Sequence, residues 1–335
     1  TKEDILWMPA TLIIMSKISV IVLIYNTSKF LDRCVRSLME QTLTDIEYVF
    51  VDDASTDDSL TVLKKVLTDY PEKKEDIKLI RNERNLGQAK SRIKAIEATT
   101  GEYVIHCDSD DYVDQTMYEV LYNKAVNEHL DIVWCDFFRT DGKRSTVSLQ
   151  GPSADSWSFM KDILTGRRMG TLWCHLIKGN LVREHDYLAP ASNLMEDVVL
   201  LMQYAYRAHS FGYVNRPLYY YYHSETSITQ NTSPEKTLWQ VKEMDKNITV
   251  IIGFLNKVGG DKNLRIYIDY RKYFNKRWLL PIIDSPKKCR LWLEEYPEIN
   301  RSLFFNPLLT KWDKAISFLV ETRLYPLLRK IIRGR

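Results

Sequence analysis

The stretch Gly101-Glu102-Tyr103-Val104-Ile105-His106-Cys107-Asp108-Ser109-Asp110-Asp111 decides how the whole chain is interpreted. Its apolar part, Tyr103 to Cys107, is compact and contains β-branched residues, which predicts a buried strand. Three carboxylates follow it within four residues. In an open α/β sheet, ligands bind beyond the carboxyl ends of the strands, and carboxylates there can share a divalent cation with a phosphate ester. We therefore predict a Mg²⁺ or Mn²⁺ site that holds a nucleotide diphosphate. The same residue types also form turns and helix caps, which is the alternative.

The composition is that of an ordinary globular protein. The chain has 335 residues, of which 45% are hydrophobic and 27% charged, so it can bury a large core. A net charge of +3 is too small to indicate nucleic-acid binding. The cysteines are Cys34, Cys107, Cys135, Cys174 and Cys289. They are scattered and form no CxxC pair, which indicates reduced thiols in a cytoplasmic protein rather than a zinc site or a disulfide framework.

The N-terminal residues need separate treatment because Ile5 to Tyr25 are largely apolar. Pro9 and Lys17 interrupt this run, and no small-residue cleavage pattern follows it, so we do not interpret it as a signal anchor. We interpret residues 1–15 as an N-terminal extension. The near-continuous β-branched run from Ile18 to Tyr25 instead predicts a central parallel strand.

Strand and helix patterns alternate through the first part of the chain. Strands are predicted at 18–25, 46–51, 77–80 and 103–107, with helices at 31–39, 60–67 and 89–98 between them. Such alternation with short connections predicts an α/β fold with a mostly parallel sheet. The second strand ends in Asp52 and Asp53, so two strands present aspartate pairs toward one crevice. The absence of GxGxxG and GxxxxGK[ST] motifs excludes a dinucleotide-binding dehydrogenase and a P-loop enzyme.

These residues carry a family resemblance. The matching segments are 20–26, 51–57, 85–87 with Arg92, 101–103 and 108–111. In order and spacing they resemble family-2 glycosyltransferases with the GT-A fold, of the type that builds bacterial surface polysaccharides, over roughly residues 16 to 228. The resemblance implies a nucleotide-sugar donor, usually UDP-linked, a Mn²⁺ or Mg²⁺ ion, and an inverting single displacement.

The resemblance also assigns residues to the nucleotide. By position, Tyr25 and Asp53 would hold the uracil and ribose, with Asp52 nearby. Arg92 would approach the diphosphate or the base. One departure from the family pattern touches this loop, because the glycine that usually follows the aspartate pair is Ala54 here.

For the metal, the resemblance implies Asp110 as the direct ligand and Asp111 in support. Asp108 would touch the ribose or, through water, the metal. His223, at the end of a tyrosine-rich strand, would be a further metal contact or would stabilise the leaving group, since imidazole can serve in either way.

The acceptor side depends on three residues. Trp173 would line the sugar pocket, although a place in the core is an equally good interpretation. The family's catalytic base corresponds to Asp197, which would take a proton from an acceptor hydroxyl, and Glu196 would help to place the acceptor. The alternative is that this pair merely favours the start of a helix electrostatically.

After Pro234 the pattern becomes helical. We therefore divide the chain into the extension, a catalytic domain at 16–232 whose nucleotide half ends near 138, and a helical C-terminal region at 233–335. Residues 311–335 contain seven basic and two acidic residues, a difference of +5, beside an apolar stripe. Such a basic amphipathic segment is typical of binding to an anionic membrane surface, and packing on the catalytic domain is the alternative.

The combined prediction is metal-dependent, inverting transfer from a UDP-sugar to a hydroxyl of a glycan or lipid-linked glycan, at the inner face of the plasma membrane. Two alternatives remain at this stage. One is a phosphohydrolase with an aspartate nucleophile, which also has a DxD sequence after a strand. The other is a non-catalytic subunit that binds sugar nucleotides.

Overall fold

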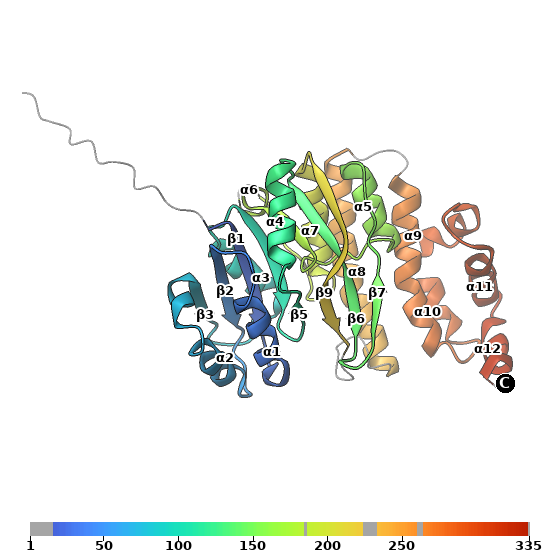
Figure 1. Ribbon diagram of the computed structural model, residues 1–335. Coiled ribbons are helices and arrows are strands. Elements are labelled where there is room, and N and C mark those ends of the chain that lie inside the picture. Colours follow the sequence, from blue (N-terminus) through green and yellow to red (C-terminus); the bar gives the residue numbers. More distant parts are fainter. Residues whose placement is uncertain (1–15, 184–185, 224–232, 260–263, 334–335) are drawn as a thin grey trace, which may run out of the picture.

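The computed structural model describes residues 16–183, 186–223, 233–259 and 264–333 (Figure 1). The predicted extension at 1–15 lies outside these residues. The strands are β1 Ile18–Ile24, β2 Ile46–Asp52, β3 Ile77–Arg81, β4 Tyr103–Asp108, β5 Tyr112–Val113, β6 Ile132–Thr140, β7 Ser145–Ser148, β8 His175–Lys178 and β9 Phe211–Tyr222. The α-helices of the catalytic domain are α1 Ser28–Met39, α2 Ser59–Leu67, α3 Gln88–Glu97, α4 Met117–Asn127, α5 Ser156–Thr165, α6 Gly179–Arg183 and α7 Glu196–Arg207.

The strands form one sheet in the order β3-β2-β1-β4-β8-β6-β9-β5, with β7 paired to β6. The nucleotide half is parallel as predicted, because β1 pairs with both β2 and β4, and β2 pairs with β3. The second half adds antiparallel partners, since β8 runs against β4 and β6, and the polar segment after β6 returns as the hairpin strand β7. The whole sheet is therefore mixed, and the α/β architecture is confirmed.

Helices cover both faces of the parallel strands, which explains why these strands are apolar throughout. Val20 and Val22 of β1 belong to a core that includes residues of α1 and α2. Ile21, which points the opposite way, belongs to a second core with residues of α3, α5 and α7. A strand with a buried residue on each face carries no polar alternation.

A buried polar network fixes the start of β4 against β1 and β2. Glu47 accepts hydrogen bonds from Ser19 Oγ at 2.5 Å and from Thr100 N at 2.9 Å, and Lys78 Nζ lies 2.5 Å from its Oε1. A Cβ on Gly101 would lie 2.5 Å from the backbone nitrogen of Ser19. Only glycine therefore allows this approach, which places the aspartate-bearing end of β4 beside β1.

The predicted helical C-terminal region is present. Its helices are α8 Pro234–Lys257, α9 Leu264–Lys276, α10 Cys289–Glu294, α11 Lys311–Glu321 and α12 Tyr325–Arg333. They form a third core around residues such as Trp292, Ile299 and Leu303, and Figure 1 shows α9 to α12 at the end of the molecule opposite β3 and α2. No helix among the described residues is both long and apolar enough to span a bilayer.

This third core contains a buried cation, Lys276. Its Nζ lies 4.9 Å from the ring centroid of Trp292 and 2.5 Å from Oδ1 of Asn300. Burial lowers the pKa of Lys276 to about 7, although the charges of Glu321, Glu295 and Glu298 act in the opposite direction.

We expect Lys276→Met to stabilise the protein at neutral and acidic pH. An unfolded lysine has a pKa of about 10.4, so between about pH 7 and 10 the unfolded chain binds more protons and the stability of the wild type should rise with pH. The Met variant has no titrating group at this position, so its stability lacks this rise with pH. Its advantage over the wild type should be largest below about pH 7 and should vanish toward about pH 10. Denaturant unfolding across this range measures it, with the exposed Lys311 changed to Met as control. An advantage independent of pH would contradict the prediction.

Candidate active site

The two predicted aspartate-bearing strand ends lie at the same edge of the sheet. Strand β1 lies between β2 and β4, with Ile24 opposite Asp52 and Leu23 opposite Asp108. The carboxylates of β2 and β4 are therefore separated by a single strand. Tyr25 follows directly on β1, and its side chain is 46% exposed, so its ring is accessible at this edge.

Asp53 organises the loop that follows β3. Its carboxylate accepts hydrogen bonds from the backbone nitrogens of Leu86 and Gly87 at 2.8 and 2.9 Å and from Asn82 Nδ2 at 2.8 Å. Asp52 in turn accepts from Ser55 N at 3.0 Å and lies 3.3 Å from Arg81 Nε. Both carboxylates thus hold the loops at this edge of the sheet in place. Their direct contact with a ribose or base stays a prediction.

The backbone conformation of Ala54, the residue after the Asp52–Asp53 pair, explains why the family prefers glycine at this position. Ala54 has a φ of 59°, in the left-handed region that costs a residue with a Cβ roughly 1–2 kcal/mol. The turn is otherwise well held, because Asn26 Oδ1 accepts from Thr56 N at 2.8 Å and from Asp57 N at 3.3 Å. Ala54 therefore places backbone strain in a turn that these hydrogen bonds hold in place.

The three carboxylates after β4 have different environments. Asp111 is fully buried, and its two oxygens accept from the Tyr219 hydroxyl at 2.6 Å and from Tyr222 N at 2.7 Å. Asp108 and Asp110 are partly exposed. Among the described residues, no side chain hydrogen-bonds to the Asp108 carboxylate. Asp111 therefore joins the loop to β9, whereas Asp108 and Asp110 keep part of their surface exposed at this edge of the sheet.

Electrostatics favour a cation beside this pair. Burial, the neighbouring Asp110 and Glu196 raise the pKa of Asp108 to about 7, although Arg92 opposes the shift. Burial also raises the pKa of Asp110. Within the described residues no group of three or more His, Cys, Asp or Glu side chains is arranged to hold a metal ion. Two carboxylates nevertheless fit Mg²⁺ or Mn²⁺, because such ions are commonly held by one or two carboxylates together with substrate phosphates.

Arg92 connects the two halves of the site. It is buried in α3, where its Nη2 donates to Glu196 Oε1 at 2.9 Å and its Nη1 lies 2.9 Å from Nδ1 of His106. Glu196 is the first residue of α7 and is itself buried. As placed, both side chains are engaged with each other rather than with the crevice. The pair fixes the start of α7 against the nucleotide half, and breaking such a buried pair is strongly destabilising.

Asp197 is the next residue of α7 and is partly exposed. Burial and the nearby carboxylates of Glu196 and Asp108 raise the pKa of Asp197 well above its ordinary value, with Arg92 opposing the shift. A carboxylate with a raised pKa has an increased affinity for a proton. Its place beside the Asp108 edge is consistent with the predicted base.

Trp173 and His223 both lie at β9, because Trp173 packs against this strand and His223 directly follows it. The Trp173 ring is 4% exposed and stacks on Tyr219 with ring centroids 4.2 Å apart. As placed, it contributes to the core and offers almost no surface to a sugar. His223 is exposed at the end of β9, where its backbone nitrogen donates to Thr140 O at 2.7 Å. Its role toward metal or diphosphate stays a prediction.

The structure adds Arg33, which sequence reasoning missed. Its guanidinium lies over the rings of Tyr112 and Tyr222 at 4.4 and 4.5 Å, and its Nη2 donates to the Asp110 carbonyl at 2.9 Å. This places a cation on α1 beside the aspartate loop. The helical periodicity of α1 gave no signal for it, because Arg33 lies between residues of the buried stripe.

A second missed residue comes from the C-terminal region. Arg271 of α9 donates from Nη2 to Met195 Sδ at 3.1 Å, and its Nε has no hydrogen-bond partner among the described residues. Burial lowers the pKa of Arg271, while Tyr296 and Asp197 act in the opposite direction. The C-terminal helices therefore bring a cation to the start of α7, beside the predicted base.

Comparison with known proteins identifies the class. Residues 19–188 match the model for glycosyl transferase family 2. The chain is 32% identical over 231 residues to the cholesterol galactosyltransferase of Borreliella burgdorferi, covering 65% of this chain and 63% of that protein. It is 30% identical over 272 residues to the uncharacterized glycosyltransferase YibD of Escherichia coli, covering 77% and 76%.

Solved structures show the same fold. TarS of S. aureus, in complex with UDP-GlcNAc, matches with a TM-score of 0.57 and 18% identity, covering 92% of this chain and 88% of that chain. The mannosyltransferase PcManGT of Pyrobaculum calidifontis, in complex with GDP-Man and Mn²⁺, matches with a TM-score of 0.54 and 12% identity, covering 96% and 88%. The protein thus belongs to glycosyl transferase family 2 and is a glycosyltransferase with a GT-A-type fold.

Proposed function

We propose that the protein transfers a sugar, with inversion, from a UDP-sugar to a hydroxyl group of a glycan or lipid-linked glycan, and that the reaction depends on a divalent metal ion. The observation that carries this proposal is that Asp108, at the end of β4, lies close enough to Asp197 at the start of α7 for the two carboxylates to interact electrostatically. Family membership supports an enzyme and argues against the alternatives of a phosphohydrolase or a non-catalytic subunit.

In this mechanism Asp197 accepts the proton of the acceptor hydroxyl as that oxygen attacks the anomeric carbon. The bond from the anomeric carbon to the diphosphate oxygen breaks on the opposite face, which inverts the configuration. Glu196 keeps Asp197 in place through its ion pair with Arg92. Tyr25 would pack against the base, and Arg33 would place positive charge beside the diphosphate.

Asp108 and Asp110 would hold Mn²⁺ or Mg²⁺. When bound, such an ion supplies Lewis-acid stabilisation of the negative charge on the departing diphosphate. The Mn²⁺ in the mannosyltransferase complex supports this part of the proposal, and the UDP-GlcNAc in the TarS complex supports the UDP donor.

Titration calorimetry with UDP and GDP, with and without Mn²⁺, tests this function. Tight binding of UDP only when Mn²⁺ is present is the expected result, and it would be followed by product analysis with UDP-sugars. Preferential binding of GDP would overturn the UDP donor. Failure of either nucleotide to bind would overturn the proposed function itself.

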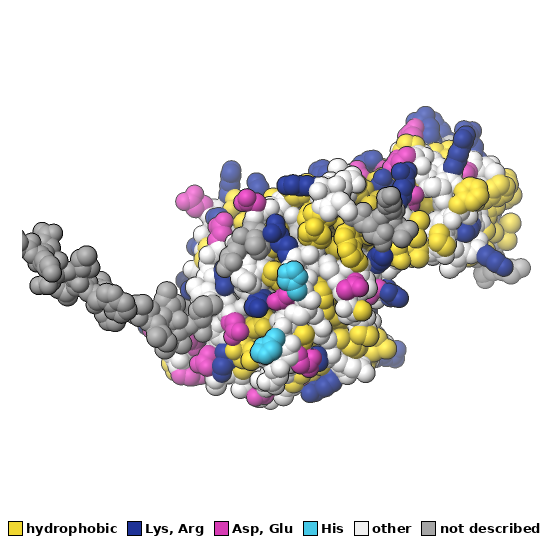
Figure 2. Space-filling model, turned by 90° about the horizontal axis from the view of Figure 1, so that it is seen from above, with side chains coloured by type: hydrophobic (Ala, Val, Ile, Leu, Met, Phe, Trp, Pro, Cys, Tyr) yellow, Lys and Arg dark blue, Asp and Glu magenta, His cyan; other side chains and the backbone are white. Residues whose placement is uncertain are grey.

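The acceptor would reach the site at a membrane. Leu327 and Ile331 of α12 are exposed, as is Leu324 just before the helix, and the exposed cations Arg323 and Lys330 lie beside them in the sequence. Figure 2 shows hydrophobic side chains together with Lys and Arg on the surface of the C-terminal end. This combination suits the headgroup region of an anionic bilayer. The cholesterol acceptor in the name of the Borreliella relative supports a lipid acceptor.

We expect the protein to sediment with vesicles that contain anionic phospholipid and not with neutral vesicles. Leu327→Ser combined with Ile331→Ser should reduce the bound fraction strongly, because the inserted apolar area is lost. Leu149→Ser, which removes another exposed leucine at 68% exposure, is the matched control and should bind as the wild type does. Equal binding by the wild type and the double variant would remove α12 as the membrane contact.

A further inference from the structure

A cavity of about 560 Å³ lies between the catalytic domain and the C-terminal region, away from the aspartate loop. Helix α5 and the turn after it form one wall, and α9 with the segment near Leu308 forms the other. Its lining residues are Ser158, Lys161, Thr165, Gly166, Arg167, Tyr267, Tyr270 and Leu308. This volume falls within the range of small-molecule binding sites. Neither the donor nor the metal proposal uses any of these residues.

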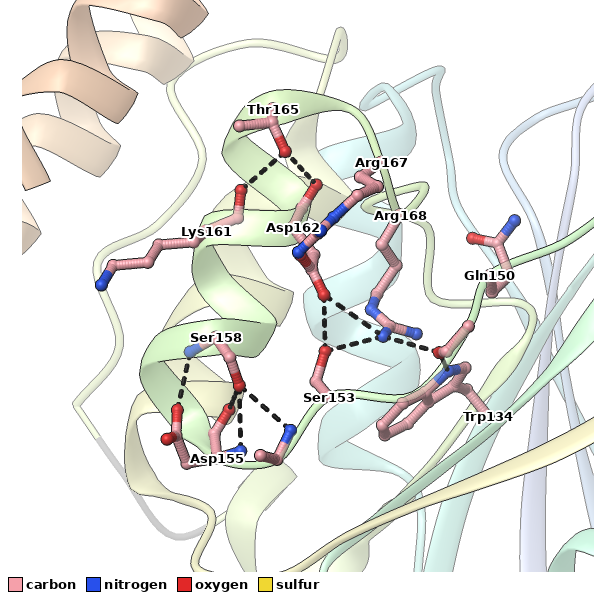
Figure 3. A network of polar contacts seen from close by, with 12 residues as sticks. Trp134, Gln150, Ser153, Asp155, Ser158, Lys161, Asp162, Thr165, Arg167 and Arg168 are labelled. Atoms are coloured by element: carbon pink, nitrogen blue, oxygen red, sulfur yellow. Dashed lines mark hydrogen bonds and ion pairs between the residues drawn. The ribbon is translucent and has the colours of Figure 1, made fainter. Parts of the chain in front are cut away.

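The chemistry of the lining is cationic and aromatic. Lys161 Nζ lies 5.3 Å from the ring centroid of Tyr267, and Figure 3 shows this lysine extending from α5 away from the neighbouring polar network. The second tyrosine, Tyr270, lies one turn further along α9. The two tyrosines supply flat surfaces for the apolar face of a sugar ring, and the lysine supplies positive charge for an anion.

The polar network below the cavity holds its second cation in place. Asp162 accepts from Arg167 Nε at 2.7 Å and from Ser153 Oγ at 2.7 Å, and its other ion-pair partner is Arg168 at 3.7 Å. Figure 3 shows these groups converging on the single carboxylate. One carboxylate thus faces two guanidinium groups, so the floor of the cavity keeps a net positive charge. Arg167 is largely exposed, and its side chain is available to a ligand.

Residues next to both walls of the cavity contact residues at the start of α7. A Cβ on Gly170, a few residues after Arg167, would lie 2.8 Å from Cγ2 of Val198, which follows the proposed base. On the other wall, Arg271 follows Tyr270 and contacts Met195. Residues next to both walls therefore contact the start of α7, and none of the lining residues belongs to the nucleotide half.

We propose that this cavity is a subsite for an anionic unit of the acceptor, namely a sugar or polyol that carries a phosphate or carboxylate group. The inference rests on the proposed function, because it concerns the acceptor of that reaction. Lys161 and Arg167 pair with the anion, and Tyr267 and Tyr270 pack against the ring or carbon chain. The C-terminal region thereby contributes to acceptor choice, since α9 supplies one wall.

The test is calorimetric titration of the full chain at low salt with three probes. These are a ribitol-phosphate trimer, trigalacturonic acid and the neutral maltotriose. There are three variants. The first is a double variant that combines Lys161→Gln with Arg167→Gln. The others are the single variants Tyr270→Ala and Lys161→Gln, of which the latter leaves the bonds of Asp162 intact. The matched control, Lys64→Gln with Lys65→Gln, removes two exposed lysines from α2. UDP with Mn²⁺ is titrated into every variant, and thermal melts verify folding.

At least one anionic probe should bind the wild type, and its Kd should rise about tenfold or more in the double variant and in Tyr270→Ala. The control should bind it as the wild type does, and the Kd for UDP should not change in any variant. The better of the two anionic probes identifies the source of the charge as phosphate or carboxylate. Equal binding of maltotriose, no binding of either anionic probe, or unchanged binding by the Lys161 variants would overturn the subsite. If the wild type does not bind UDP in the presence of Mn²⁺, the proposed function is overturned instead, so the two failures are distinguishable.

Discussion

We expect Asp197→Asn to lower kcat for sugar transfer by at least about 100-fold, the range usual for loss of a general base, while UDP binding with Mn²⁺ stays at the wild-type level. The amide has the shape of the carboxylate but accepts no proton. The backbone hydrogen bond from Val198 N to Asp197 Oδ1 at 2.8 Å can be kept by the amide oxygen, so the helix should begin as before. Release of UDP and formation of product measure the effect.

Two further variants make this result specific. Asp284→Asn changes an exposed aspartate of the C-terminal region that forms an ion pair with Lys288 at 2.7 Å, and it should transfer sugar as the wild type does. Glu196→Gln should instead lower the stability, because it weakens the partner of buried Arg92. If Asp197→Asn retained full activity, Asp197 would not be the base, and a non-catalytic role for this residue would have to replace it.

The second large effect concerns Asp110. We expect Asp110→Ala to abolish the enhancement of UDP binding by Mn²⁺, with a loss of at least about tenfold in affinity, because it removes one of the two carboxylates that would hold the ion. The protein should remain folded, since in the described residues the Asp110 contact to Arg33 is made by the carbonyl oxygen rather than by the side chain. Calorimetry with and without Mn²⁺ measures both affinities.

Asp111→Asn is the informative comparison. Asp111 is buried and accepts hydrogen bonds from Tyr219 and Tyr222. Asp111→Asn should therefore lower the melting temperature more than Asp110→Ala does. A loss of metal-dependent binding in Asp111→Asn without any loss of stability would contradict the structural role that we assign to this residue. Metal-dependent binding that persists in Asp110→Ala would remove Asp110 as a ligand.

Much of the fold and part of the site could be predicted from the sequence because both depend on local pattern. The apolar runs that end in Asp52 and Asp108 predicted two parallel strands, and the structure pairs both of them with β1. Asp197 was assigned from the family resemblance, and the helix start that the Glu196–Asp197 pair favours lies at the first turn of α7. These signals lie within a few residues of one another, so a sequence displays them directly.

The tertiary structure decided which of these polar side chains remain accessible. Asp110 and Asp111 are adjacent residues with the same chemistry. The Asp111 carboxylate, however, accepts a hydrogen bond from the hydroxyl of Tyr219, 108 residues away in the sequence. The Arg92 side chain points to Glu196 rather than to the crevice, over a separation of 104 residues. In the same way, Arg271 reaches the start of α7 only through the packing of α9. The sequence by itself determined where the parallel strands lie along the chain and which carboxylates follow them. The partners of those carboxylates were decided by long-range packing, because the burial and hydrogen bonds that fix them join elements that no local pattern relates.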